Sequence, residues 1–271
     1  MRKVCTALTA CAMLVVAAPA LAADCGNSSA GFGAWLNRFA DYAASQGVSN
    51  RALDTGLAGV SYDSNVIHLD RNQHSFKLSF EAFYARRVGG GLLAKGRRLM
   101  ATHARTLDRM EQQFGVPREI VVAIWGLETN YGADRGQGKS IVRSLATLAY
   151  DCRRSEFFRG QLLDSLRIID SGDMSVSQLR GGWAGEIGQT QFLPTPYVKY
   201  AVDFDGDGHR DLIHSVPDVL ASTANFFKAH GWQAGGSWEP GRANYRVISD
   251  WNRAEVYQRT ISKMASILAR G

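Results

Sequence analysis

Apolar side chains recur every three to four residues along most of the chain, which is the period of an amphipathic helix. Residues 31–47 show this most clearly, with Trp35 and Phe39 on one face. The same period predicts further helices at residues 49–60, 92–115, 117–132, 140–152, 153–172, 215–231 and 253–271. Alternation of apolar and polar residues, which is typical of a strand, is confined to residues 244–251. The pattern therefore predicts one mainly helical domain.

Residues that cap helices stand at several ends of these segments. Ser49 and Ser140 precede apolar runs, and their side chains are expected to accept a hydrogen bond from the first turn that follows. Gly115 and Gly172 follow such runs and are expected to end them. Pro117 is suited to the first turn of the helix at residues 117–132.

Residues 1–23 differ from the rest of the chain. They combine a short basic start, an apolar run and a small-residue "ALA" ending near Ala22, which is typical of a cleaved export signal. The alternative is a membrane anchor, but the run is short for a spanning helix and lacks a stop-transfer flank. We therefore expect a mature chain of residues 24–271, periplasmic or secreted, without a stable membrane anchor.

Charge and cysteine content refine this picture. Loss of the two basic residues Arg2 and Lys3 with the signal lowers the formal net charge from +6 to +4. A small positive charge suits an anionic polymer such as the cell wall, or serves only solubility. Cys25 and Cys152 then remain, and an oxidising compartment favours a disulfide between them over two free thiols.

The stretch "WGLETNYG" places Glu128 among apolar residues of the helix at 117–132. Ile124 lies in one apolar stripe, and Trp125 lies with Glu128 in the neighbouring stripe. Burial there would disfavour the ionised form and raise the pKa of the carboxyl, as a general acid near neutral pH requires. The alternative is a structural carboxylate paired with an arginine at the edge of the core. Spacing alone leaves both interpretations open.

A glycine-rich stretch, residues 181–200, also carries candidate chemistry. Its aromatic and amide side chains are Trp183, Gln189, Gln191, Phe192 and Tyr197. Glycines let the backbone approach a ligand, aromatic rings offer flat faces to sugars, and amides bond to hydroxyl and acetamido groups. The stretch therefore indicates a carbohydrate groove, or else a turn whose aromatic residues belong to the core.

The run "DFDGDGHRDL" has spacing like that of an EF-hand calcium loop. The expected ligands are Asp203, Asp205, Asp207, the carbonyl of His209, and Asp211. His214 stands where the bidentate glutamate belongs, so we expect weak calcium binding, completed by water or by Asp218. A metal-free turn is the alternative.

Taken together, these residues resemble the lytic transglycosylase B family of exported murein-cleaving enzymes. The resemblance is carried, in order through nearly the whole mature chain, by "GVPREIVVAIWGLETNYG", "SLATLAYDCRRSEFF", "WAGEIGQTQFLPTPYVKYAVDFDGDG", "ASTANFFKAHGW" and "ISDWNRAEVY". It implies a mainly α, lysozyme-like fold with a saccharide groove. The implied partner is the peptidoglycan glycan strand, not nucleic acid, and we expect a monomer.

The resemblance also implies a mechanism with one carboxylate, Glu128. This acid would protonate the oxygen of the β-1,4 bond from N-acetylmuramic acid to N-acetylglucosamine. It would then act as base on the muramyl C6 hydroxyl, which closes a 1,6-anhydro ring. An intramolecular nucleophile makes a second carboxylate unnecessary. No cofactor is required for this chemistry, and calcium would be structural only.

Further roles follow from the resemblance residue by residue. The implied substrate-binding residues are Arg153, Arg154, Gly182, Gln191, Tyr197, Asn252 and Tyr257. The two arginines could instead form a solvated face, and Asn252 could cap the last helix.

The sequence also departs from the family pattern. Gly182 replaces a serine of some relatives, so backbone groups or water would bind the substrate acetamido group in place of the serine hydroxyl. Phe83 falls where a groove tyrosine is expected. A short segment before residue 242 and no wall-binding domain after Gly271 imply an open groove.

Two other functions stay open. A hydrolytic muramidase on the same fold would need a second carboxylate, such as Asp134 or Glu186. A calcium-stabilised glycan-binding protein would not need Glu128 at all.

Overall fold

The computed structural model describes residues 25–73, 78–134 and 138–270, so the predicted signal at residues 1–23 lies outside the described residues. The helices are α1 (Phe32–Ser45), α2 (Asn50–Gly56), α3 (Ser64–Arg71), α4 (Phe80–Arg87), α5 (Gly90–Thr102), α6 (Ala104–Phe114), α7 (Arg118–Thr129), α8 (Ile141–Tyr150), α9 (Ser155–Ser171), α10 (Pro194–Tyr200), α11 (Val216–Ala229), α12 (Ala243–Trp251) and α13 (Glu255–Leu268). Two short strands, β1 (Lys139–Ser140) and β2 (Arg180–Gly181), pair antiparallel with Lys139 opposite Gly181. The predicted mainly helical fold is confirmed.

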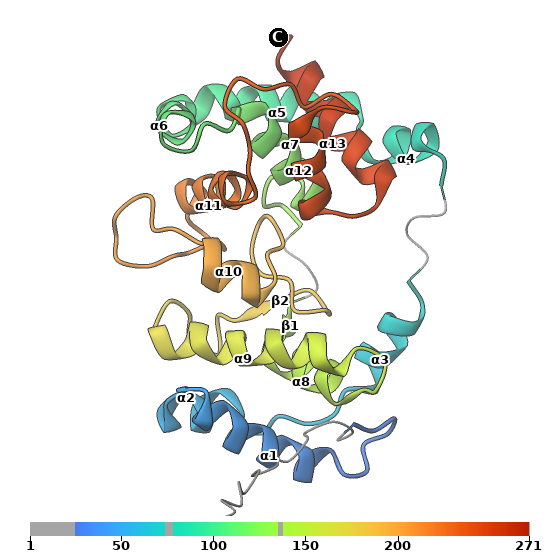
Figure 1. The fold of residues 1–271 in the computed structure, drawn as a ribbon, viewed down its shortest axis with the longest axis vertical. Helices are drawn as coiled ribbons and strands as arrows, with labels where there is room; N and C mark the ends of the chain where they lie inside the picture. Colours follow the sequence, from blue (N-terminus) through green and yellow to red (C-terminus); the bar gives the residue numbers. More distant parts are fainter. Residues whose placement is uncertain (1–24, 74–77, 135–137, 271) are drawn as a thin grey trace, which may run out of the picture.

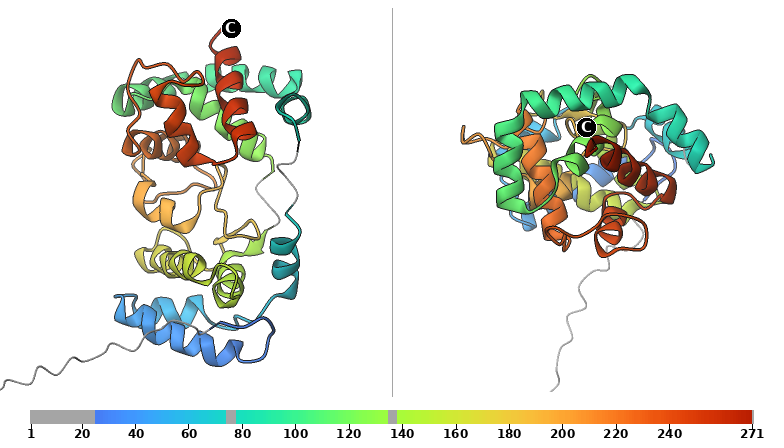
Figure 2. Two further views of the ribbon diagram at one scale, coloured as in Figure 1. Left: turned by 45° about the vertical axis from the view of Figure 1, so that its right-hand side comes forward. Right: turned by 90° about the horizontal axis from the view of Figure 1, so that it is seen from above.

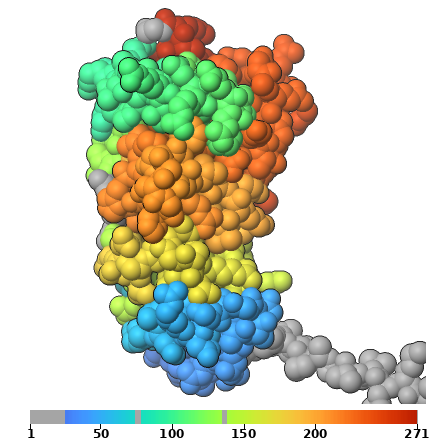
Figure 3. Space-filling view, turned by 90° about the vertical axis from the view of Figure 1, so that its left-hand side faces the viewer, coloured from blue at the N-terminus to red at the C-terminus, as the bar shows by residue number. Residues whose placement is uncertain are grey.

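The helices form layers stacked along the long axis of the molecule (Figure 1). One end holds α1 and α2, followed by the packed pair α8 and α9, then α10 and α11; the other end holds α5, α6, α7, α12 and α13. Figure 2 shows that α3 runs along one side of this stack. The space-filling view in Figure 3 shows that the layers do not follow sequence order: the green layer, which holds α6, lies directly above the orange layer, which holds α11, and the yellow layer, which precedes α11 in sequence, lies below it.

Several predicted helix ends are confirmed. The Ser49 and Ser140 side chains accept from the backbone N–H groups of Ala52 and Arg143. Gly115 ends α6 in the left-handed conformation, which a residue with a side chain rarely adopts, and Gly172 ends α9 in the same way.

Two sequence predictions about secondary structure are wrong. The single helix at residues 92–115 is two helices that meet at His103. Both pack on α7, but α5 also packs on α13 whereas α6 also packs on α11, so the two helices run in different directions to reach different partners. The alternating segment at residues 244–251 belongs to α12. Its first turn is anchored by the fully buried Asn244, whose amide bonds to backbone groups of Gln233 and Gly236. Tertiary contacts therefore override the local pattern at both places.

The helix that carries Glu128 is the centre of its layer. Residues 120–127 of α7 are all buried, with α5, α6, α11 and α13 packed around them. Such a helix is apolar on every side because each side faces protein. Glu128 is partly exposed at its end.

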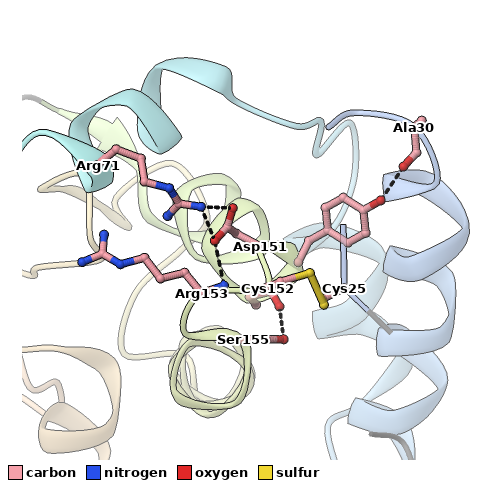
Figure 4. The surroundings of a disulfide bond; sticks show 9 residues. Cys25, Ala30, Arg71, Asp151, Cys152, Arg153 and Ser155 are labelled. Carbon is pink, nitrogen blue, oxygen red and sulfur yellow. Dashed lines mark hydrogen bonds and ion pairs between the residues drawn. A yellow bond between two sulfur atoms is a disulfide. The ribbon is translucent and has the colours of Figure 1, made fainter. Parts of the chain in front are cut away.

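A disulfide joins Cys25 to Cys152, with Cα atoms 5.0 Å apart, as predicted for an oxidising compartment (Figure 4). It ties the start of the described chain to the turn between α8 and α9. Asp151 beside it accepts from the guanidinium of Arg71 over 2.8 Å and 2.9 Å. Within the described residues, no helix is long and apolar enough to span a bilayer.

Candidate active site

Glu128 stands in the last turn of α7, where the helix ends. Asn130 and Tyr131 have positive φ angles of 49° and 58°, so the chain turns away directly after the acid. Trp251 Nε1 and Tyr257 Oη donate hydrogen bonds to Glu128 Oε1 over 3.1 Å and 2.8 Å. The acid is therefore held by two donors that come from α12 and α13.

The surroundings of Glu128 favour its protonated form. Burial is the largest influence and raises the pKa of the carboxyl, and the nearby Glu186 carboxyl raises it further. The hydrogen bonds from Tyr257 and Trp251 and the charge of Arg87 lower the pKa, but less than burial raises it. Glu128 therefore keeps its proton to a higher pH than an exposed glutamate, as a general acid must.

A cavity of 490 Å³ opens beside Glu128. Aromatic rings form much of its lining, from Phe157, Phe158, Trp183, Phe192, Phe226 and Trp251. Its polar lining residues are Gln73, Arg154, Glu186, Gln191, Asp250 and Asn252. Flat apolar faces beside hydrogen-bonding groups suit a sugar, whose ring face is apolar and whose edges carry hydroxyl and amide groups.

A second cavity, of 610 Å³, reaches Glu128 from the side of α4 and α5. Its other charged lining residues are Arg86, Arg87, Lys95, Arg98 and Asp134. No aromatic side chain of the described residues lines it. This side of the groove therefore attracts anionic groups instead of offering faces for sugar rings.

The two cavities that meet at Glu128 form one groove. Four of the predicted substrate-binding residues lie at this groove. Arg154, Gln191 and Asn252 line the first cavity, and Tyr257 bonds to Glu128. Gln191 has a positive φ of 56°, and its amide donates to the carbonyl of Gly188 over 2.8 Å. Its side chain is therefore fixed before any ligand arrives.

Asn252 lines the first cavity and does not cap α13. Its side chain accepts from the N–H of Ala254 over 3.0 Å, but Ala254 is itself the N-cap of α13, and no side chain of the described residues caps the first turn of that helix. This bond fixes the position of the Asn252 amide at the cavity.

The predicted arginine pair is anchored to a buried carboxylate. Asp70 is 2% exposed, and it accepts from Arg71 and Arg153 over 2.8 Å each, and from Arg154. Burying a carboxylate is costly unless it is paired, so these arginines do not form a freely solvated face. Of the pair, Arg154 reaches the cavity, and Arg153 completes the support of Asp70.

Two aromatic residues lie away from the expected positions. Tyr197 is fully buried, and its hydroxyl donates to the carbonyl of Arg210, so it belongs to the core and lines neither cavity. Phe83 is buried with its ring 6.0 Å from that of Tyr257, so it supports a residue that holds the acid. A periodic pattern does not separate a buried aromatic residue from a groove residue.

Sequence reasoning missed the part played by Trp251 and Arg87, and it named Glu186 only as a second carboxylate for a hydrolase. Trp251 lies in "ISDWNRAEVY", which marked the C-terminal segment without naming the ring that bonds to the acid. Arg87 binds the carbonyl of Leu127 through its guanidinium, and no motif signals this contact. The nearness of Glu186 to Glu128 depends on a loop whose path the sequence does not reveal.

The aspartate loop is well defined. Asp203 accepts from three backbone N–H groups, those of residues 206, 207 and 208, which lower the pKa of its exposed carboxyl. Oxygen atoms of Asp203, Asp205 and Asp218 lie within 4.8 Å of one another, a donor set that suits a hard cation. The predicted ligands Asp207 and Asp211 are not part of this cluster, and their carboxylates accept from backbone N–H groups further along the loop.

This helical fold, with Glu128 beside an aromatic cavity, matches a known family. The sequence matches the transglycosylase SLT domain over residues 31–243, and the chain belongs to this family. Membrane-bound lytic murein transglycosylase B of Escherichia coli strain K12 is 45% identical over 130 residues. That alignment covers 48% of this chain and 36% of the relative, so it spans about a third of the relative's length.

Solved structures agree with the family assignment. SltB3 from Pseudomonas aeruginosa, solved in complex with NAG-NAM-pentapeptide, is 33% identical with a TM-score of 0.83, over 89% of this chain and 80% of that one. The lytic transglycosylase SLT35 of Escherichia coli, solved in complex with calcium, is 25% identical with a TM-score of 0.76, over 87% and 92% of the two chains. The resemblance found in the sequence is therefore confirmed.

Proposed function

We propose that this protein is a peptidoglycan lytic transglycosylase that cleaves the β-1,4 bond from N-acetylmuramic acid to N-acetylglucosamine and leaves a 1,6-anhydromuramyl end. The observation that carries the proposal is Glu128, a carboxyl with a raised pKa that faces a cavity lined by aromatic rings. The relative SltB3, solved with NAG-NAM-pentapeptide, supports the substrate class.

The reaction uses Glu128 twice. Protonated Glu128 gives its proton to the glycosidic oxygen as the bond from that oxygen to C1 breaks. The muramyl C6 hydroxyl then attacks C1 and returns its proton to the carboxylate, so no water is consumed. Tyr257 and Trp251 stabilise the carboxylate that exists between the two proton transfers, because both donate to Oε1.

The residues around the acid bind and orient the glycan. Trp183 and the neighbouring rings of the first cavity lie against sugar faces, and the amides of Gln191 and Asn252 bond to hydroxyl or acetamido groups. Arg154, held by Asp70, offers a fixed guanidinium to the muramyl carboxylate or the peptide stem.

A hydrolytic muramidase is the second candidate, favoured by one observation. Glu186 lines the same cavity as Glu128, so a second carboxyl is present on the sugar side of the groove. Hydrolysis would need that carboxyl to be ionised and to activate water. Burial raises the pKa of Glu186 as well, which weighs against a general base.

The remaining expectations complete the proposal. The aspartate loop would hold a calcium ion that supports the fold and takes no part in the reaction. Of the predicted ligands Asp203, Asp205, Asp207, the His209 carbonyl and Asp211, only the first two cluster with Asp218, and this cluster and the calcium complex of SLT35 support the proposal. The signal-like residues 1–23 and the disulfide support a periplasmic or secreted protein.

Mass spectrometry of the soluble products tests the proposal. The mature protein and its Glu128→Gln variant are each incubated with purified peptidoglycan. We expect anhydromuropeptides from the parent and none from the variant. Products with reducing ends would establish the hydrolase instead. No product from either protein, together with retained binding to peptidoglycan, would leave a glycan-binding protein.

A further inference from the structure

The loop after β2 folds back on itself and carries a carboxyl into the groove. The N–H of Gly182 donates to the carbonyl of Glu186 over 3.0 Å, which closes a tight turn. Within this turn Glu186 Oε2 accepts from the N–H of Ala184 over 2.9 Å. The carboxyl is therefore fixed by its own loop and does not depend on a distant partner.

Gly182 is the residue that leaves room for this carboxyl. A Cβ atom at position 182 would lie 2.1 Å from Glu186 Oε2 and 2.8 Å from its Cδ, closer than real atoms approach. Gly182 is not among the glycines with positive φ, so its backbone would accept another residue. A side chain at position 182 would therefore have to push the Glu186 carboxyl aside, and glycine leaves it in place.

Glu186 has no cationic partner among the described residues, although it lines a cavity that also contains Arg154. That arginine is held by Asp70. Burial raises the pKa of Glu186, and the hydrogen bonds that its carboxyl accepts from the backbone N–H groups of Glu186 and Ala184 oppose this only in part. A buried acid without a protein counter-charge is costly to keep, and a ligand that donates a hydrogen bond reduces that cost.

Glu186 lies on the same cavity as the aromatic rings and Glu128. We propose that Glu186 binds the glycan next to the bond that Glu128 cleaves, by accepting a hydrogen bond from an acetamido N–H or a hydroxyl of the sugar, and that Gly182 is glycine to permit this. This inference rests on the proposed function. It assigns to Glu186 a binding role and leaves proton transfer to Glu128 alone.

The same position makes Glu186 an electrostatic neighbour of the acid. The groups that shift the pKa of Glu128 most are Tyr257 from α13, Trp251 from α12, Arg87 from α4 and Glu186 from the loop after β2. The other charged residues that line the two cavities beside Glu128 are Arg86, Lys95, Arg98, Asp134, Arg154 and Asp250. Of the groups that shift this pKa most, only Glu186 adds a like charge, which raises the pKa of Glu128. Neutralising Glu186 should therefore move the alkaline limb of the rate profile to lower pH.

Steady-state kinetics on soluble, peptide-bearing glycan strands test this assignment. Glu186→Ala should raise KM about tenfold with a smaller change in kcat, since one buried hydrogen bond is lost. Glu186→Gln keeps the shape and one acceptor, so its KM should lie between those of the parent and Glu186→Ala. The alkaline limb of its rate profile should lie at lower pH than that of the parent. The matched control is Glu119→Gln, which changes a partly buried acid of α7 that lines neither cavity.

The glycine gives an independent arm of the test. Gly182→Ser should reproduce the KM of Glu186→Ala by displacing the carboxyl, and adding Gly182→Ser to Glu186→Ala should change nothing further. Unchanged KM and pH profile in Glu186→Ala and Glu186→Gln would overturn the proposal. Additive effects of the two substitutions would overturn the part assigned to Gly182.

Binding separates this inference from the proposed function. In a Glu128→Gln background, which cannot turn over, the affinity for NAG-NAM-pentapeptide is measured with and without Glu186→Ala. We expect about tenfold weaker binding with the second change. Loss of affinity without any anhydro product from the parent would reject the transglycosylase and retain Glu186 as a ligand-binding group. Equal affinities would reject the binding role of Glu186, whether or not the parent protein releases anhydro products.

Discussion

The groove and the aspartate loop use the same functional group in opposite ways. Glu128 lies at the end of a buried helix, meets two side-chain donors, and has a raised pKa because burial outweighs them. Asp203 is exposed, meets three backbone N–H groups, and has a lowered pKa because those groups bond to the ionised form. A carboxyl among apolar residues keeps a proton to give, whereas a carboxyl among backbone donors stays ionised and ready for a cation.

Substituting each acid by its amide should produce the largest contrast. Glu128→Gln removes the transferable proton and should lower the rate of anhydromuropeptide release by about 10³-fold. Asp203→Asn lies in a separate loop and should leave the rate within about twofold, because a charge exposed to solvent is screened. Initial rates on purified peptidoglycan, with saturating calcium, compare the two. Equal losses would show that the two regions are not independent.

Calcium should act on the loop and not on the groove. If Asp203, Asp205 and Asp218 hold the ion, millimolar calcium should raise the melting temperature by about 5 °C over chelated protein. The Asp203→Asn variant should lose this shift, whereas Glu128→Gln should keep it. Thermal unfolding with calcium, with magnesium and with chelator measures the effect. The same melting curve in all three solutions would argue against a structural ion.

The donors to Glu128 should tune the acid without being essential. Tyr257→Phe removes the 2.8 Å hydrogen bond to Oε1 and should lower kcat about tenfold, because the intermediate carboxylate loses a donor. That bond lowers the pKa of Glu128, so the alkaline limb of the rate profile should move to higher pH. A control is Tyr245→Phe on α12, which lines neither cavity. A lower kcat with an unmoved limb would contradict the electrostatic explanation.

Helix periodicity predicted the long helices, but their arrangement depends on contacts that no local pattern contains. The short helices α3, α4 and α10 were not predicted, because each offers fewer apolar positions than the period needs. The segment of α12 alternates by chance, and the amide of Asn244 fixes it as a helix through backbone groups of residues 233 and 236.

The candidate site could be predicted in part for the same reason. The acid could be predicted because Glu128 interrupts an apolar surface of its own helix. The two hydrogen-bond donors to Glu128 could not be predicted, because Trp251 and Tyr257 lie more than 120 residues away along the chain. They meet the acid only because α13 packs on α7 and α12 packs on α13. The contact between Gly182 and Glu186 depends on a tight turn, whereas a sequence shows only that a glycine and an acid are four positions apart.

The smallest effect should be the most informative about the two environments, because it tests the sign of each pKa shift. The pKa of Glu128 is raised by folding, so its contribution to stability is present below the ordinary glutamate range and is lost as pH rises through the raised value. Glu128→Gln should therefore gain stability over the parent as pH rises from 4 to 8, by about 1 kcal/mol or about 3 °C.

The pKa of Asp203 is lowered by folding, so its contribution to stability is present above the ordinary aspartate range and is lost as pH falls. Asp203→Asn should then be less stable than the parent near neutral pH and should approach it in acid. Melting temperatures of the three proteins across this pH range, with chelator present, measure both trends. Parallel curves would mean that the two carboxyls do not differ in the way their surroundings indicate.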